Sequence, residues 1–275
     1  MSLLQAAILA VIQGVTEFLP ISSSAHLALA PWLLGWRDQG LLFDIALHIG
    51  TLAAVLLYFA RDWIQIIGHG FGFHGGADED LRRRPRLLWV LAVASIPTGI
   101  AGLLLQDYAA TTLRKPVIMG AMLIAVGLLM ALAERLGNRR KRLGEISFAD
   151  AMIIGFAQVL ALVPGTSRSG ITITAGLFRN IDRGAAARFS FLLSTPAVAA
   201  AAAKALLDLW RQGIPADMRL AFLVGILLSA LTGCLAISLL LKWLRRHGLK
   251  FFIYYRVVFG IIVIALAIFF RHPAV

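Results

Sequence analysis

Six apolar runs, each about long enough to cross a lipid bilayer, follow one another along this chain of 275 residues. A membrane-spanning helix needs roughly 20 mostly apolar residues. The runs are continuous rather than alternating, so they predict helices and argue against a β-barrel. The sequence therefore predicts an all-α polytopic membrane protein, with spans over residues 41–60, 87–105, 116–134, 185–207, 218–241 and 251–270.

The composition supports the same class of protein. Hydrophobic residues make up 60% of the chain and its mean hydropathy is +0.84, whereas a soluble domain has roughly 45–50% apolar residues. This excludes a soluble metabolic enzyme. The net charge of +12 comes from basic residues that lie between the spans and form no continuous stripe. We therefore expect contacts with anionic membrane lipids and no nucleic-acid partner.

Two further apolar segments, 2–35 and 148–178, are each interrupted by a proline, at Pro20 and Pro164. Proline removes a backbone donor and disfavours helix in the residue before it. Lipid tolerates such a broken backbone only where it is buried in protein or lines a cavity. A short apolar helix, a polar break and a second short helix predict a re-entrant helical hairpin. We expect two such hairpins in addition to the six transmembrane helices.

The two breaks resemble each other in sequence. Segment 19–23, Leu-Pro-Ile-Ser-Ser, aligns with segment 163–167, Val-Pro-Gly-Thr-Ser, about half the chain length away. Broken helices at matching positions are typical of an inverted repeat, with the functional site at the interface between the repeats. We expect a single integral membrane domain over 1–275, with a first repeat at about 1–134 and a second at about 148–270.

The distribution of Lys and Arg predicts the orientation in the membrane. Most of the 26 Lys and Arg residues lie in alternate loops, and loops rich in these residues are cytoplasmic. Both termini and the entrance to the first hairpin are then expected outside, while the second hairpin enters from the cytoplasm. The basic loops are 61–86, 135–147, 179–188 and 242–250.

Polar side chains gather around the first break. Gln13 and Glu17 are four residues apart, so they share one helix face. A carboxylate inside an apolar segment is costly, which makes Glu17 a candidate metal ligand, proton donor or proton acceptor; the alternative is that it satisfies backbone groups near the break. Ser23 and His26 are three residues apart, and a hydroxyl beside an imidazole is the minimum for nucleophilic attack. The three consecutive serines of this break are also candidates for capping the next helix.

Arg168 is the most informative residue of the second break. A guanidinium inside a hairpin needs an anion, and its fork matches phosphate oxygens with two parallel hydrogen bonds. Ser167, Ser169 and Thr172 offer hydroxyl donors, and a helix that starts here adds its N-terminal amide groups. The pattern predicts a phosphate site, although not of the Walker type, because the Gly-Lys-Ser signature is absent. The alternative for Arg168 is a structural ion pair with Glu17.

Two more polar residues stand at the start of a predicted span. Asp44 and His48 are four residues apart, so they share a helix face. They are expected either to line the same cavity as the breaks or to lie at the membrane interface.

These motifs resemble the undecaprenyl-diphosphate phosphatase family, the bacitracin-resistance proteins of bacterial membranes. The family's first pattern is Glu or Gln, three residues and Glu, followed by a Pro-Ser-Ser stretch that ends in His. Its second pattern is Pro-Gly-x-Ser-Arg-Ser-x-x-Thr, which residues 164–172 match, and the order and length of the spans match along nearly the whole chain. Gln13 takes a place that is often Glu, so metal ligation would here rest on Glu17 alone. The first pattern corresponds to Gln13, Glu17, Pro20, Ser22, Ser23 and His26.

The resemblance implies hydrolysis of undecaprenyl diphosphate to the monophosphate carrier lipid of cell-wall synthesis. It implies a location in the bacterial cytoplasmic membrane, with the site open to the outer, periplasmic face. A divalent cation, Mg²⁺ or Ca²⁺, is implied as well, and Glu17 is its expected oxygen ligand. Arg168 is expected to hold the diphosphate, and Ser23 to attack it or to orient water, with His26 as base. The other candidates for substrate binding are Gln13, Ser22, Ser24, Ser167, Ser169 and Thr172.

The alternative function is transport of a phosphorylated prenyl lipid. Inverted repeats and broken helices are common in transporters, and the same site could bind a lipid phosphate headgroup and move it across the bilayer. A serine and a histidine beside an arginine favour hydrolysis, because binding alone needs no nucleophile. The sequence leaves open whether a serine or water attacks, which metal is bound, and whether the chain forms a homo-oligomer.

Overall fold

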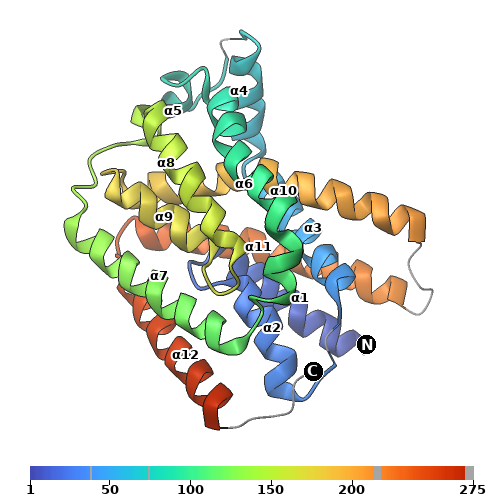
Figure 1. Ribbon diagram of the computed structural model, residues 1–275. Helices are drawn as coiled ribbons and strands as arrows, with labels where there is room; N and C mark the ends of the chain where they lie inside the picture. Colours follow the sequence, from blue (N-terminus) through green and yellow to red (C-terminus); the bar gives the residue numbers. More distant parts are fainter. Residues whose placement is uncertain (38, 74, 213–217, 270–275) are drawn as a thin grey trace.

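A computed structural model describes residues 1–37, 39–73, 75–212 and 218–269, and these residues fold into helices joined by short loops (Figure 1). No β-strand occurs in these ranges; a single isolated bridge pairs Lys141 with Ile181. The predicted all-helical class is therefore confirmed. The last residue of the predicted span 251–270 and the C-terminal residues after it lie outside the described residues.

The helix bounds match the apolar pattern closely. Short helices flank each proline, and long helices follow them in chain order (Figure 1). The elements are α1 Leu3–Phe18, α2 Ser23–Leu34, α3 Leu41–Tyr58, α4 Ala60–Gly70, α5 Glu79–Arg82, α6 Leu87–Thr111, α7 Pro116–Leu136, η1 Leu143–Glu145, α8 Phe148–Val159, η2 Leu160–Leu162, α9 Arg168–Phe178, α10 Arg183–Gln212, α11 Arg219–Leu244 and α12 Lys250–Phe269.

Within the described residues, four helices are long and apolar enough to cross a membrane: Leu87–Leu105 of α6, α7, α11 and α12. A fifth candidate is the pair formed by α3 and α4, which are bent by 74° relative to each other. These four or five candidates establish a multi-pass architecture. The sixth predicted span falls in α10, a helix of 30 residues, and remains a prediction.

The two proline-containing segments have the expected arrangement of helix, break and helix. α1 ends at Phe18 and α2 begins at Ser23. α8 ends at Val159, η2 extends it to Leu162, and α9 begins at Arg168. The residue before each second helix has a positive φ, 78° for Ser22 and 68° for Ser167. Such values are uncommon for residues other than glycine and concentrate at functional sites. The backbone is thus strained at the same point of both breaks.

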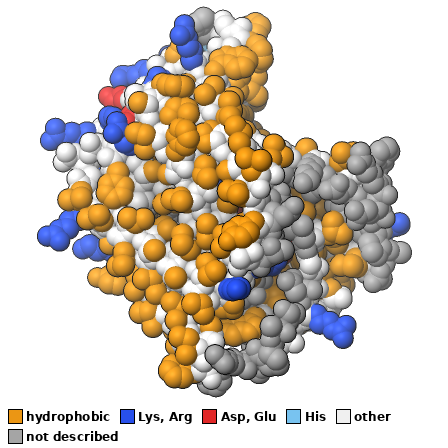
Figure 2. Space-filling view, viewed as in Figure 1, with side chains coloured by type: hydrophobic (Ala, Val, Ile, Leu, Met, Phe, Trp, Pro, Cys, Tyr) orange, Lys and Arg blue, Asp and Glu red, His pale blue; other side chains and the backbone are white. Residues whose placement is uncertain are grey.

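The apolar residues of this protein cover its outside as well as its interior. Figure 2 shows hydrophobic side chains spread across the described part of one face, with most of the Lys and Arg side chains toward its edges. Exposed leucines include Leu103, Leu104 and Leu239. In water such a surface would be unfavourable, whereas in a bilayer it faces hydrocarbon. The distribution fits a protein whose middle lies in lipid.

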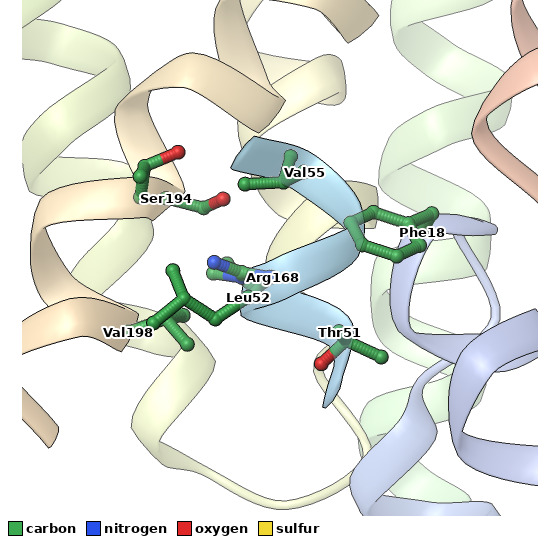
Figure 3. Close-up of a pocket in the computed structure, with 8 residues that line it drawn as sticks. Phe18, Thr51, Leu52, Val55, Arg168, Ser194 and Val198 are labelled. Atoms are coloured by element: carbon green, nitrogen blue, oxygen red, sulfur yellow. The ribbon is translucent and has the colours of Figure 1, made fainter. Parts of the chain in front are cut away.

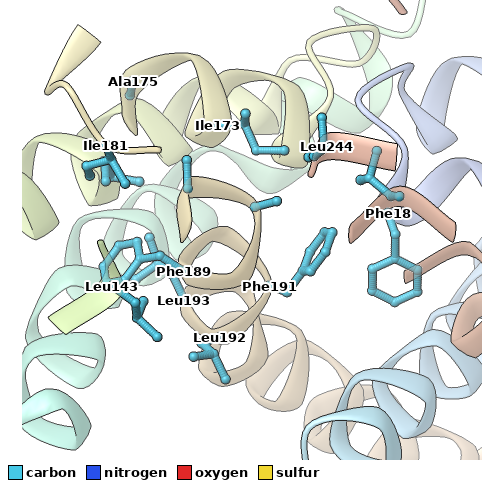
Figure 4. Close-up of a cluster of buried hydrophobic side chains, with 14 of the residues drawn as sticks. Phe18, Leu143, Ile173, Ala175, Ile181, Phe189, Phe191, Leu192, Leu193 and Leu244 are labelled. Carbon is cyan, nitrogen blue, oxygen red and sulfur yellow. The ribbon is translucent and has the colours of Figure 1, made fainter. Parts of the chain in front are cut away.

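A cluster of aromatic and aliphatic side chains holds the two halves of the chain together beside the breaks. The ring of Phe18, the last residue of α1, meets the ring of Phe191 in α10 edge-on, with centroids 5.4 Å apart (Figure 4). Phe189, Leu192 and Leu193 extend this cluster in α10. Edge-to-face aromatic pairs add about 0.5–1.5 kcal/mol beyond the area they bury. The end of α1, and with it Glu17, is thereby held against α10.

The four basic loops predicted for the cytoplasm meet at one end of the molecule. Their ion pairs connect segments far apart in sequence, and Leu249 N–H also donates to Glu134 Oε1 at 3.0 Å. The ion pairs are Arg183–Glu134, Arg188–Asp62, Arg188–Asp78, Lys141–Asp150 and Arg179–Asp150.

These contacts also affect the pKa of Asp78. Burial raises this pKa, but hydrogen bonds from Leu81 N–H and Arg188 outweigh the effect of burial, so the pKa lies below its usual value.

Candidate active site

The carboxylate of Glu17 is the centre of the polar site. It lies in the last turn of α1, and its side chain is only 7% exposed. Gln13, one helical turn earlier, donates from Nε2 to Glu17 Oε2 at 3.0 Å. The spacing of four residues therefore places both side chains on one face, as the sequence predicts.

The two breaks meet at this carboxylate. Ser23 Oγ donates to Glu17 Oε2 at 2.5 Å, and Arg168 Nη2 donates to Glu17 Oε1 at 2.5 Å. Ser23 is the first residue of α2 and Arg168 is the first residue of α9, so the first residues of the two helices that follow the breaks bind the two oxygens of one side chain, although the sequence alignment pairs Ser23 with Ser167. The structural ion pair that was the alternative for Arg168 is present.

Arg168 nevertheless retains binding capacity. Its Nη1 atom is buried and has no hydrogen-bond partner in the described structure, and an unpaired buried charged donor is costly. Figure 3 shows the guanidinium between α3 and α10, where it lines a small cavity together with Phe18, Thr51, Leu52, Val55, Ser194 and Val198. The cavity volume of about 10 Å³ is close to the minimum for one water molecule. Arg168 therefore keeps one unpaired buried donor, in a side chain that lines a cavity with room for about one water molecule.

His48 lies at the edge of this site, within reach of Glu17, although the residues that line this cavity and the larger one beside His26 include neither His48 nor Asp44. Its Nε2 atom is 3.7 Å from Glu17 Oε2, its side chain is 37% exposed, and its Nδ1 atom is 2.7 Å from Asp44 O. The Asp44 carboxylate forms an ion pair with Arg114 Nη2 at 3.3 Å. α3 therefore contributes a partly exposed imidazole to the surroundings of Glu17.

His26 lies on a different side of the first break. Its Nδ1 atom is 2.7 Å from Ser22 O, and its Nε2 atom is 2.6 Å from the hydroxyl of Tyr255. The ring stacks on Phe259, with centroids 4.8 Å apart, and lines an apolar cavity of about 310 Å³ between α1 and α12. Both ring nitrogens thus have partners other than Ser23, whose hydroxyl binds Glu17. The sequence did not indicate Tyr255, because 229 residues separate it from His26.

The remaining hydroxyl candidates mostly hold the breaks in place. Gly165 N–H donates to Ser24 Oγ at 3.3 Å, and Ser169 Oγ donates to Leu19 O at 3.1 Å, so each break is bound to the other. Ser22 Oγ lies 3.1 Å from Ser24 Oγ.

The other two hydroxyl candidates serve α9 itself. Ser167 Oγ caps the helix by accepting from Gly170 N–H at 3.1 Å, as N-cap residues do. Thr172 donates from Oγ1 to Arg168 O and lies 2.6 Å from Ser190 Oγ of α10. Thr172 therefore joins α9 to α10, and its hydroxyl already has its partners.

Arg256 of α12 is a second guanidinium at the junction, and the sequence analysis did not select it. Its side chain is fully buried, and no Asp or Glu pairs with it within the described residues. The sequence did contain a signal that could have selected Arg256, because it is a charged residue inside the apolar run 251–270. Its acceptors are the backbone oxygens of Pro20, Leu123, Met122, Gly165 and Thr166. The junction holds two guanidinium groups, those of Arg168 and Arg256, and one carboxylate, that of Glu17. It therefore carries an excess of positive charge.

The oxygen atoms beside Glu17 fit part of a divalent cation site. Gln13 Oε1 is buried and has no hydrogen-bond partner in the described structure, and carbonyl and carboxylate oxygens are what Mg²⁺ and Ca²⁺ prefer. No group of three or more His, Cys, Asp and Glu side chains in the described ranges is arranged to hold a metal. A cation bound here would need further oxygens from a ligand such as a phosphate.

Two broken helices that meet in an apolar, multi-pass protein, with a carboxylate, a hydroxyl and two guanidinium groups at the junction, define a membrane protein built to bind an anion. The chain belongs to the family described as "Bacitracin resistance protein BacA", which it matches over residues 6–262. This agrees with the resemblance that the two motifs suggested.

Similar proteins cover essentially the full length of the chain. One from Desulforudis audaxviator is 47% identical over 95% of this chain and 96% of its own length. A second from Thermodesulfovibrio yellowstonii is 47% identical over 98% of this chain and 99% of its own, and one from Thermomicrobium roseum is 45% identical over 98% and 100%. Each of these relatives is named undecaprenyl-diphosphatase.

Proposed function

We propose that this protein hydrolyses undecaprenyl diphosphate to undecaprenyl phosphate and phosphate. The observation that carries the proposal is the pairing of Ser23 and Arg168 with the two oxygens of Glu17 where the breaks meet. This places a nucleophile, a proton acceptor and a phosphate-binding cation within one small site. The names of the relatives and their coverage of the whole chain support the same activity and a prenyl diphosphate lipid as substrate.

The diphosphate is bound mainly by positive charge. Arg168 offers Nη1, and the first turns of α2 and α9 offer amide groups that have no intrahelical acceptor. Phosphoryl transfer needs chiefly positioning and charge neutralisation. When bound, a divalent cation would neutralise further charge on the phosphate oxygens, and Glu17 and Gln13 Oε1 would hold it.

The chemical step begins at Ser23. Its Oγ attacks the terminal phosphorus, and its proton passes to Glu17, to which it is already hydrogen-bonded at 2.5 Å. The bond from this phosphorus to the bridging oxygen breaks, and undecaprenyl phosphate leaves with that electron pair. Water then cleaves the phosphoserine, which restores Ser23 and releases phosphate. Moving the intact lipid across the bilayer would need no hydroxyl bound to a carboxylate, so hydrolysis explains the site better than transport.

Phosphate release from the purified, detergent-solubilised protein tests this function. We expect wild-type protein to release phosphate from undecaprenyl diphosphate, and Ser23→Ala to lower the rate by roughly 10⁴–10⁶-fold, because it removes the nucleophile. Ser2→Ala is the control, because Ser2 is an exposed helix cap far from the breaks in sequence. Wild-type protein that releases no phosphate would refute the function. Full activity in Ser23→Ala would instead assign the attack to water.

Two pairs of matching contacts support an inverted repeat with re-entrant hairpins. Ser95 of α6 donates to Leu91 O in its own helix and to Leu193 O of α10, at 2.8 and 3.3 Å. Ser229 of α11 likewise donates to Gly225 O in its own helix and to Leu47 O of α3, at 2.8 and 3.0 Å. In each case a long helix binds the helix that follows the proline-containing segment of the other half of the chain, α10 for α6 and α3 for α11.

The first break would open to the outside of the bacterial cytoplasmic membrane. The four basic loops meet at one end of the molecule, and loops of this kind remain in the cytoplasm. The loop between α2 and α3 and the loop between α6 and α7 then lie outside, and both termini do as well. His48 and the Asp44–Arg114 pair, which lie beside or near these outer loops, would mark the route to Glu17.

Single cysteines placed in these loops test the orientation, and the chain has only Cys234 to remove first. We expect Arg37→Cys and Lys115→Cys to react with a membrane-impermeant thiol reagent added to intact cells, because both loops face outward. Arg140→Cys and Arg246→Cys should react only after the cells are opened. Positions next to His26 are less suitable, because Ala25 and Leu27 are buried. The reverse labelling pattern would invert the topology.

A further inference from the structure

Arg256 makes five hydrogen bonds to backbone oxygens and is not exposed at all. The acceptors belong to three separate places. Nη1 donates to Pro20 O of the first break at 3.2 Å, and Nη2 donates to Gly165 O and Thr166 O of the second break at 3.1 and 2.9 Å. Nε and Nη2 also bind two carbonyl oxygens of α7. One guanidinium therefore joins both breaks to α7 and α12.

The cost of burying this cation indicates that it does more than fill space. A buried charge without an ionic partner is expensive, and apolar side chains of similar volume commonly give equal or greater stability. Carbonyl oxygens carry only partial negative charge, so Arg256 adds nearly a full positive charge to the junction. Diphosphate is the anion that the proposed function brings to this place.

The hydrogen bonds of Arg256 also determine the orientation of the peptide groups in the second break. In a planar trans peptide, the C=O of one residue and the N–H of the next point in opposite directions. Because Thr166 O binds Arg256, the N–H of Ser167 points away from this guanidinium. Ser167 comes directly before α9 and Arg168. Without a cation behind them, the oxygens of Gly165 and Thr166 would be free to turn toward a bound phosphate and repel it.

We propose that Arg256 is a positioning residue for phosphate binding. It holds the carbonyl groups of both breaks away from the substrate, and so leaves the amide groups at the starts of α2 and α9, together with Arg168, to face the diphosphate. This role rests on the proposed phosphatase function. It requires the five-donor fork of arginine, since the single nitrogen of lysine reaches fewer of the acceptors.

The test is Arg256→Lys, which keeps the positive charge. We expect kcat for undecaprenyl diphosphate to fall about 100-fold, as for loss of a preorganised donor in other phosphate and oxyanion sites, and the rise in Tm produced by inorganic pyrophosphate to disappear. Arg183→Lys is the matched control, because Arg183 binds Glu134 with two hydrogen bonds in the basic-loop region. It should keep both wild-type kcat and the response to pyrophosphate.

A purely structural role gives a different result. Arg256→Lys would then have a lower Tm, but its folded fraction would show wild-type kcat and a wild-type pyrophosphate response, and this outcome would overturn the proposal. If Arg256→Lys is not recovered folded, Gly170→Ala decides, because the added methyl group would crowd the second break where Arg256 binds it, 3.0 and 3.1 Å from Ser167 Cβ and Oγ and 3.3 Å from Arg256 Nη1. A wild-type pyrophosphate response in Gly170→Ala would equally overturn it. The pyrophosphate measurement remains informative even if the wild-type protein releases no phosphate, so failure of the phosphatase function is detected separately.

Discussion

Replacing Arg168 by lysine is expected to abolish most of the activity, with kcat/KM for undecaprenyl diphosphate reduced about 100- to 1,000-fold, as for the loss of a transition-state donor. Arg168 uses Nη2 to bind Glu17 and has no partner for the buried Nη1, and its side chain lines the cavity beside Thr51 and Ser194. A guanidinium can serve both partners at once because its donors form a rigid fork. The single ammonium of lysine would have to choose between the carboxylate and the phosphate.

Steady-state hydrolysis by folded Arg168→Lys protein measures this effect. Arg188→Lys is a closely matched control, because the Arg188 side chain is 19% exposed against 17% for Arg168 and also binds carboxylates, those of Asp62 and Asp78. The control should lose stability at most. If Arg168→Lys turns over substrate at close to the wild-type rate, Arg168 acts as a structural partner of Glu17 and the phosphate is held elsewhere.

The second large effect is expected at Glu17. Glu17→Gln should lower kcat by roughly 10²–10⁴-fold, because the amide cannot take the proton of Ser23. The same change leaves Arg168 without its ionic partner in a buried site, which adds to the loss. Gln13→Ala should have a smaller effect, since it removes one hydrogen bond to Glu17 and one neutral oxygen beside it but leaves the carboxylate in place.

A titration of activity against Mg²⁺ and Ca²⁺ separates the two roles proposed for Glu17. If Glu17 holds the cation, Glu17→Gln should lose the response to the metal together with the activity, whereas Gln13→Ala should keep a response at higher metal concentration. Glu79→Gln is the control, because Glu79 is an exposed carboxylate that pairs with Arg83. An unchanged metal response in the residual activity of Glu17→Gln would place the cation on the substrate phosphates alone.

The local features of the site follow from the sequence with high accuracy. The predicted hairpins 2–35 and 148–178 enclose α1 with α2 and α8 with α9 almost to the residue. Proline and hydroxyl residues act on the backbone next to them, so they mark helix ends without help from distant contacts. The shared face of Gln13 and Glu17 is likewise a property of a single helix.

The course of α3 and α4 shows what a local pattern misses. The predicted span 41–60 matches α3 closely, but the sequence assigns 61–86 to a loop, whereas α4 continues the chain as a helix after a 74° bend at Phe59. Phe59 is buried against Phe191 of α10, with ring centroids 6.2 Å apart. The bend therefore depends on packing against a helix that lies more than 100 residues away, which no window of the sequence contains.

By itself, the sequence determined that this is a helical membrane protein with two broken segments, and it selected Glu17, Ser23, His26 and Arg168 as candidates for the site. Only the tertiary structure decided which side chains meet. It pairs Ser23, rather than a neighbouring serine, with Glu17, and it places His26 against Tyr255. It also brings Arg256 into contact with both breaks. The physical reason is that helix periodicity and capping depend on neighbours within a few residues. Hydrogen bonds between helices depend instead on how the whole bundle packs.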